Sequence, residues 1–244
     1  MDCKILLCGD SAVSVVMGDE ISLDVNRLVL RLQKSLDEHP VEGIIEVIPS
    51  YSSLMIQYDP MILSYENLCE EIQKHADDMP EIEDKDTLVK EIPICYEGEL
   101  GPDLEECARL QGCSTEEVIR MHSSHLYYVY MLGFAPGHPY AARFEEPFAF
   151  KRRPEPRLKI PGRSVVVQQN LSDLIPFDQP CGWNIIGTTP LNITDFSRKD
   201  PFLVYAGEWT RYIPVSRSEY DLIRKDVEAG TYQVKAYKKE AAEK

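Results

Sequence analysis

The hydrophobic pattern of this chain changes character once, and that change constrains the fold more than any other feature. Before residue 78, short β-branched runs alternate with segments in which apolar residues recur at helical spacing. Charge and proline interrupt this pattern over residues 77–81. From Leu126 to about residue 190, β-prone runs are separated by frequent glycine and proline. Two such patterns in one chain predict two domains and an α+β fold class.

The first part predicts the order strand, helix, strand, strand, helix. Residues 11–18 are a β-branched run, and a segment with helical spacing follows. Residues 44–48 and 54–58 are strand-like runs joined by a turn-prone segment, and Ser64 can cap a second helix. A strand near residues 88–95 would complete a ferredoxin-like split β-α-β arrangement, with two helices on one face of an antiparallel sheet.

The second part predicts two short helices followed by a compact β-barrel. Gly112 can end the first helix, and Ser114 can begin the next in a capping box with the glutamate three residues later. Short strands with shaped turns after Leu126 indicate the barrel. Ser216 begins a second capping box, which predicts a C-terminal helix before a charged, solvated tail.

Length and composition suit this division. The chain has 244 residues, of which 43% are apolar, enough to fill two modest cores. The boundary is expected between residues 78 and 92, which divides the chain into a ferredoxin-like domain over 1–85 and a barrel domain over 86–244.

Charge and cysteine content narrow the classes of partner. A net charge of -15 repels phosphate backbones and anionic lipid, so neither nucleic acid nor a membrane is expected as a partner. No apolar run approaches the roughly 18 residues that span a bilayer, and the N-terminal run is too short for a signal peptide. Seven irregularly spaced cysteines, without a Cys-x-x-Cys pair, indicate reduced thiols. We therefore expect a cytoplasmic protein that binds other proteins and small ligands.

Four sequence blocks carry a family resemblance. They are Gly9–Ala12, Glu91–Tyr96, Tyr130–Gly137 and Gly182–Pro190, and their order and spacing agree as well as their residues. On these blocks the chain resembles the B subunit of 5-oxoprolinase, a carboxyltransferase-domain family also described as allophanate hydrolase subunit 1 or Kip-type kinase inhibitor. The resemblance implies a ferredoxin-like N-terminal domain followed by a cyclophilin-like β-barrel.

The same resemblance implies a hydrolase subunit that is not active alone. In this family, subunits A, B and C together hydrolyse 5-oxoproline to glutamate with ATP, and the C subunit carries a homologous barrel. One branch instead inhibits a sensor histidine kinase, so a non-catalytic binding protein is the alternative. Neither a Ser-His-Asp nor a Cys-His arrangement is evident in the sequence, and no catalytic residue is assigned.

Two loops depart from the residues usual in the family. His138 stands where the family usually has phenylalanine, which introduces a titratable ring. Further along, Leu171, Ser172 and Asp173 stand where the family usually has Gln-Thr-Gly. The loss of that glutamine favours the binding-protein alternative, because a binding protein need not retain a catalytic side chain.

The candidate ligand site combines three segments. The loop from Gly133 to Tyr140 can offer backbone N–H groups, Arg157 offers a guanidinium fork for a carboxylate, and Trp183 offers an apolar wall. Ligand contacts are expected from Pro136, Gly137, His138, Tyr140, Arg157, Ser164, Ser172, Gly182 and Trp183. His122 is expected to form hydrogen bonds under the site. Neither a carboxylate nor a cysteine completes a metal set with it, so no metal is predicted.

Each candidate also has an ordinary structural interpretation. The glycine–proline loop could be only a turn, Arg157 could pair with a surface carboxylate, and His138 could be a bystander. Trp183 could be a core residue. Cys181 could be a reactive thiol or a small buried hydrophobe. The basic run 151–153 could meet an acidic partner or simply be solvated.

Overall fold

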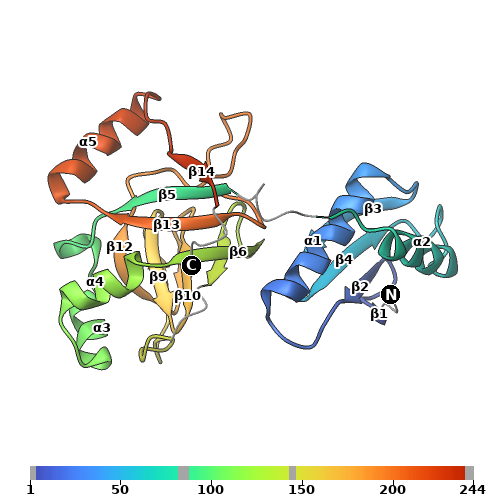
Figure 1. The fold of residues 1–244 in the computed structure, drawn as a ribbon, viewed down its shortest axis with the longest axis horizontal. Coiled ribbons are helices and arrows are strands. Elements are labelled where there is room, and N and C mark those ends of the chain that lie inside the picture. The colour runs from blue at the N-terminus through green and yellow to red at the C-terminus, as the bar shows by residue number, and fades with distance from the viewer. Residues whose placement is uncertain (1–3, 82–87, 143–146, 240–244) are drawn as a thin grey trace. The chain divides into compact units, whose positions relative to one another are not determined.

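The computed structural model describes residues 4–81, 88–142 and 147–239 (Figure 1). Contacts along the backbone separate two compact units, Met1–Glu83 and Asp84–Lys244. Each unit has its own sheet and its own hydrophobic core.

Two sequence-based expectations fall outside the described residues. The predicted boundary between residues 85 and 86 lies within 82–87, and the predicted tail lies almost entirely within 240–244. Both stay predictions. Within the described ranges, no helix is long and apolar enough to cross a membrane.

The first unit is an antiparallel sheet packed with two helices. Its strands lie in the order β1-β2-β4-β3. Their bounds are β1 Lys4–Leu7, β2 Ala12–Val16, β3 Ile44–Pro49 and β4 Ser53–Tyr58. The helices are α1 (Leu23–Glu38) and α2 (Tyr65–Asp77), and Ser22 and Ser64 cap their N-termini. Buried residues of both helices join one core with the alternate residues of β2 and β4, so the predicted helices and hairpin are confirmed.

The fourth strand of this sheet is not the predicted one. We expected residues 88–95 there, but β5 (Leu88–Ile94) belongs to the second unit, and β1 pairs with β2 in its place. Gly9 adopts a φ of 77°, which few other residues tolerate, and the chain turns there so that β1 lies antiparallel to β2. The apolar side chains of Ile92 and Ile94 are instead fully buried in the second core.

The second unit is built on an eight-stranded sheet. Its order is β12-β9-β10-β7-β6-β13-β5-β14. Besides β5, its strands are β6 Leu126–Leu132, β7 Pro139–Ala142, β9 Ser164–Gln168, β10 Leu171–Leu174, β12 Asn184–Thr188, β13 Trp209–Pro214 and β14 Ala236–Lys238. Just after β5, Cys95 exchanges two backbone hydrogen bonds with Thr188 of β12, at 3.0 and 2.9 Å. This bridge joins β12 at one edge to the end of β5, which is second from the other edge, so the sheet curls round on itself (Figure 1).

Three helices complete the unit. They are α3 (Leu104–Gln111), α4 (Thr115–Ser123) and α5 (Arg217–Glu228). Gly112 ends α3, and Ser216 with Glu219 forms the predicted capping box of α5. At α4, the Ser114 hydroxyl accepts the predicted hydrogen bond from the Glu117 backbone N–H. The Glu117 carboxylate pairs with Arg120 instead of bonding the Ser114 backbone N–H, so only half of the predicted capping box forms.

Strand alternation divides the side chains of β9 and β10 between two hydrophobic clusters. Val165 and Val167 lie in the large core, whereas Val166 lies in a smaller cluster with residues that include Ile160 and the partly buried Trp183. A separate pair of strands, β8 (Arg157–Ile160) and β11 (Gln179–Cys181), contributes to this smaller cluster. The outer face of β9 and β10 is therefore covered.

Asp103, at the start of α3, holds the β8 segment in place over β9 and β10. Its carboxylate accepts hydrogen bonds from Arg157 Nη1 and Nη2 at 2.8 and 2.6 Å, and from Arg153 Nη1 at 3.2 Å. It also accepts the backbone N–H of Ile185 in β12 at 2.7 Å. Because Asp103 is only 4% exposed, these bonds are shielded from water and join α3, β8 and β12.

Replacing Asp103 should therefore destabilise the second unit. Asp103→Ala leaves a buried N–H without a partner and two guanidinium groups without their anion, which should lower the free energy of unfolding by about 3 kcal/mol. Chemical denaturation measures the change. Glu106→Ala is the matched control, since it removes an exposed carboxylate one turn further along α3 and should leave the unfolding free energy essentially unchanged. Equal effects of the two variants would contradict the assignment.

Candidate functional site

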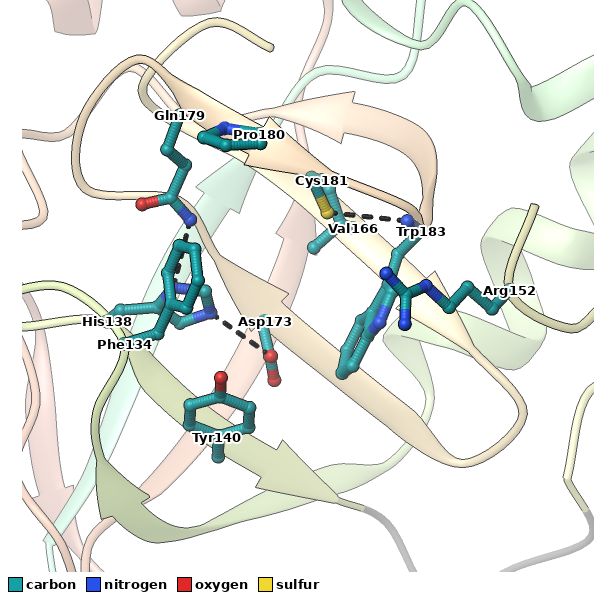
Figure 2. A pocket seen from close by; sticks show the side chains of 10 residues that line it. All are labelled: Phe134, His138, Tyr140, Arg152, Val166, Asp173, Gln179, Pro180, Cys181 and Trp183. Atoms are coloured by element: carbon teal, nitrogen blue, oxygen red, sulfur yellow. Dashed lines mark hydrogen bonds and ion pairs between the residues drawn. The ribbon is translucent and has the colours of Figure 1, made fainter. Parts of the chain in front are cut away.

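A pocket of about 230 Å³ lies on the outer face of β9 and β10 (Figure 2). Side chains from six stretches of the second unit meet there. They are Phe134, His138, Tyr140, Arg152, Val166, Asp173, Gln179, Pro180, Cys181 and Trp183. Aromatic rings, one cation and one carboxylate therefore face a single small space.

The loop before β7 delivers His138 to this pocket. In this loop the Gly133 N–H donates a hydrogen bond to the His138 carbonyl, and the His138 N–H donates one to the Ala135 carbonyl, each at 3.0 Å. Gly137 has a φ of 76°, and a Cβ there would overlap Thr194, whose hydroxyl donates to the Pro136 carbonyl at 2.8 Å. These backbone N–H groups therefore bond within the loop and do not face a ligand. Pro136 and Gly137 shape the turn rather than line the pocket.

His138 has partners on every side. Its Nε2 lies 3.2 Å from Asp173 Oδ2, and its Nδ1 lies 3.0 Å from Gln179 Nε2. Its ring stacks on Tyr140, with centroids 5.0 Å apart and an interplanar angle of 8°. Residues of three strands fix the position of this side chain and leave the residue only 5% exposed.

Asp173 forms the floor of the pocket. It is 1% exposed, and its Oδ1 accepts the backbone N–H of Ala141 at 3.1 Å. Burial raises the pKa of this carboxyl, and the hydrogen bond and charge of His138 oppose that rise. The carboxylate and the imidazole therefore act as one pair, and both are the residues that depart from the usual family pattern.

Arg152 supplies the cation at the opposite side. A Cβ at Gly182 would overlap the Arg152 side chain, so glycine allows that side chain to lie against the strand entry. The backbone N–H of Arg153 donates to the Gly182 carbonyl at 2.7 Å, which fixes the two segments together. Among the described residues, no carboxylate forms an ion pair with Arg152, so its guanidinium remains available for a ligand anion.

Cys181 is a protonated thiol in this setting. Burial raises its pKa, and its sulfur accepts the backbone N–H of Trp183 at 3.3 Å. A thiol with a raised pKa is a poor nucleophile near neutral pH. The structure therefore favours a small packing residue over a reactive cysteine.

Comparison with known proteins identifies the family. The family model for the carboxyltransferase domain, subdomain C and D, matches residues 3–204. The B subunit of 5-oxoprolinase from Bacillus subtilis (strain 168) is 35% identical over 228 residues, which cover 89% of this chain and 95% of that protein. The chain belongs to this family.

Solved structures share the fold of this chain. TTHA0988 superposes on the chain with a TM-score of 0.75 and 33% identity, covering 84% of this chain. The matched part is 40% of the TTHA0988 chain, so that protein is much longer. The urea carboxylase of Kluyveromyces lactis superposes with a TM-score of 0.78 at 17% identity, over 96% of this chain and 24% of its own, and it shares the fold.

Three of the predicted residues of this family member line the pocket: His138, Tyr140 and Trp183. Arg157 does not line it, and its guanidinium pairs with Asp103, a buried carboxylate rather than the surface one that its structural interpretation proposed. Gly182 contributes through the room it leaves for Arg152.

The predicted serines lie elsewhere. Ser164 donates its hydroxyl hydrogen to the Pro161 carbonyl at 2.8 Å. Ser172 faces the core, where its hydroxyl lies 2.8 Å from His122 Nε2. His122 is fully buried and stacks on Tyr212, with centroids 4.4 Å apart. This cluster lies behind the pocket, on the other face of β10.

Sequence reasoning missed three polar groups of the pocket. The sequence places Arg152 in a basic run that could meet an acidic partner or be solvated, and nothing in the sequence indicates Gln179. Asp173 was noticed only as a departure in a loop. The sequence did hold one indication of the site. His138 and Asp173 both differ from the residues usual in the family, and their side chains can form a hydrogen bond with each other.

The arrangement can bind a small planar molecule that carries an anionic group. Arg152 can pair with the anion, Tyr140 and Trp183 can cover apolar ring surface, and Asp173 can accept an N–H or O–H. Within the part of the chain that the structure describes, no group of histidine, cysteine or carboxylate side chains could hold a metal ion.

The Gly182→Ala variant tests the role of Arg152. The added methyl should displace a flexible side chain, so the protein should stay folded while a carboxylate ligand loses its ion pair. We expect about tenfold weaker binding of a small planar carboxylate probe, a loss of about 1.4 kcal/mol. Trp183 fluorescence in a Trp209→Phe background measures it, because these are the only two tryptophans.

Arg152→Ala should weaken binding to a similar extent. Combining it with Gly182→Ala should add little, because both remove the same contact. Additive losses would show that Gly182 acts by another route.

Proposed function

We propose that this chain is one component of an ATP-dependent 5-oxoprolinase, which acts with partner subunits A and C to convert 5-oxoproline to glutamate. Similarity to the B subunit of a 5-oxoprolinase over nearly the whole of both chains carries the proposal. The pocket supports it, since 5-oxoproline is a small planar lactam with one carboxylate and one N–H. Arg152 would take the carboxylate, and Asp173 would face the ring N–H.

The proposed chemistry explains why a second chain and ATP are needed. A lactam carbonyl resists direct attack by water, so phosphorylation of its oxygen would lower the barrier. Water would then add to the ring carbon, and the C–N bond would break to give the free amine and an acyl phosphate. A second water would hydrolyse the acyl phosphate to glutamate and phosphate. Among the described residues of this pocket, the Cys181 thiol is protonated and both ring nitrogens of His138 have hydrogen-bond partners. The groups that transfer the phosphoryl group and activate water would therefore come from the partner subunits.

A finer description of the fold belongs to this proposal. The order β2-α1-β3-β4-α2 supports a ferredoxin-like first domain over residues 1–85, with β1 at the edge expected for its last strand. The curled eight-stranded sheet supports a cyclophilin-like barrel over residues 86–244. Acidic charge and unpaired cysteines support a cytoplasmic location.

One observation favours a second function. The segment Leu171, Ser172 and Asp173 replaces the usual Gln-Thr-Gly, and Asp173 is bound to His138 rather than left free. A binding protein that docks on a sensor histidine kinase would tolerate that exchange. Reconstitution separates the two functions.

The purified chain alone should not produce glutamate from 5-oxoproline. Addition of subunits A and C from the same organism, with ATP, should give glutamate and ADP in equal amounts, measured by coupled assay. Arg152→Ala should raise the KM for 5-oxoproline about tenfold in the full mixture. The Glu106→Ala variant should behave as the unmodified chain.

Glutamate produced by the chain alone would contradict the assignment as one component of a larger enzyme. A complete mixture that binds together but yields no glutamate would favour the kinase-binding alternative.

A further inference from the structure

The His138–Asp173 pair gives the pocket a place to hold a proton. We propose that binding of a small monoanion beside Arg152 is accompanied by uptake of one proton by the His138–Asp173 pair, with Gln179 as the residue that accommodates both protonation states. This inference rests on the proposed function only for the choice of probe, 5-oxoproline.

The charges around the pair motivate the proposal. The titratable and charged groups that face His138 are Asp173 on β10, Tyr140 on β7, Cys181 on β11 and Arg152 before β8. Burial raises the pKa of both Tyr140 and Cys181, so each stays uncharged near neutral pH. With a neutral imidazole, the positive charge of Arg152 and the negative charge of Asp173 sum to zero, so the side chains that line the pocket carry no net charge.

A bound monoanion disturbs this balance. It leaves one negative charge in a site where Asp173 is 1% exposed, and an uncompensated charge is costly in such surroundings. One proton on the pair restores neutrality. The imidazolium would lie over the face of Tyr140, 5.0 Å away and almost parallel, an arrangement that favours a cation.

Gln179 allows the proton to be held without loss of a hydrogen bond. With a neutral ring, its amide NH₂ donates to His138 Nδ1 at 3.0 Å, while Nε2–H donates to Asp173 at 3.2 Å. With an imidazolium, a half-turn of the amide presents its oxygen to Nδ1–H. That oxygen is buried and has no hydrogen-bond partner among the described residues, so no bond on it opposes the turn.

The sign of the pH dependence follows. The protonated pair binds the anion more tightly, so affinity is highest at low pH and falls as the pair loses its proton. By linkage, uptake of one proton lowers the affinity about tenfold for each pH unit over which only the anion-bound pair is protonated. By linkage, the anion in turn favours the protonated pair.

Isothermal titration calorimetry of the full chain with 5-oxoproline tests the proposal. Titrations at pH 7 in phosphate and in Tris, which differ in ionisation enthalpy, give the number of protons taken up per ligand. We expect net uptake of up to one proton, and none in the His138→Phe/Asp173→Gly double variant, which carries the usual family residue at both positions. The double variant avoids an unpaired buried carboxylate, which could unfold the single variant His138→Phe.

Two further variants separate proton holding from packing. Gln179→Leu keeps the bulk of the side chain but cannot accept Nδ1–H, so it should bind the probe with proton uptake reduced at least twofold. His39→Gln changes an exposed histidine of the first unit and should leave uptake unchanged.

Binding without proton uptake, uptake that survives in the double variant, or no binding of the probe at any pH between 6 and 8 would each overturn the inference. None of these measurements needs ATP or a partner chain. Turnover in the full mixture without proton uptake would remove only this inference, and uptake without turnover would remove only the proposed function.

Discussion

Strand β10 carries polar side chains on both of its faces, and the pocket depends on that alternation. Ser172 points into the core, where it bonds His122, and its carbonyl accepts the Tyr212 hydroxyl at 3.1 Å. Asp173, one residue later, points outward to His138. A slip of β10 by one residue would drive the carboxylate into the apolar core, so the register of this strand is strongly specified. A buried polar cluster and a ligand pocket therefore share one strand as their common wall.

The same geometry explains how two unusual residues can be accommodated together. A histidine alone in this loop would lack a partner for its Nε2, and an aspartate alone in β10 would be a buried charge without a counter-group. Joined at 3.2 Å, and with Gln179 and the Ala141 N–H as further partners, they satisfy one another. The two exchanges are physically a single change, although they lie far apart in the chain, in the loop before β7 and in β10. Asp103 complements this arrangement by holding the β8 segment over the outer face.

Much of the fold follows from local sequence, and the site follows less well. Helical spacing and capping residues such as Ser64 and Ser216 predicted α2 and α5, because a cap is set by neighbours within three residues. The sheet that β5 joins was predicted wrongly. Its neighbour β13 lies more than a hundred residues later in the chain, and local sequence does not indicate so distant a partner. Arg157 was favoured over Arg152 for the ligand site for a similar reason. The sequence shows two arginines near prolines, but not that a buried Asp103 occupies one of them.

The position of β1 has a consequence for how the chain acquires its structure. Because the edge strand precedes β2, every described strand and helix of the first unit is present once residue 77 has been made. In its sheet, β1 pairs with β2 and β3 pairs with β4, so that only the pairing of β2 with β4 joins strands distant in sequence. Such local pairing favours rapid folding. The second unit must wait, since β5 pairs with β13 only once residue 214 has emerged, and with β14 only once residue 238 has emerged. During synthesis on the ribosome, the first unit can therefore be folded while the strands that will build the pocket are still unpaired.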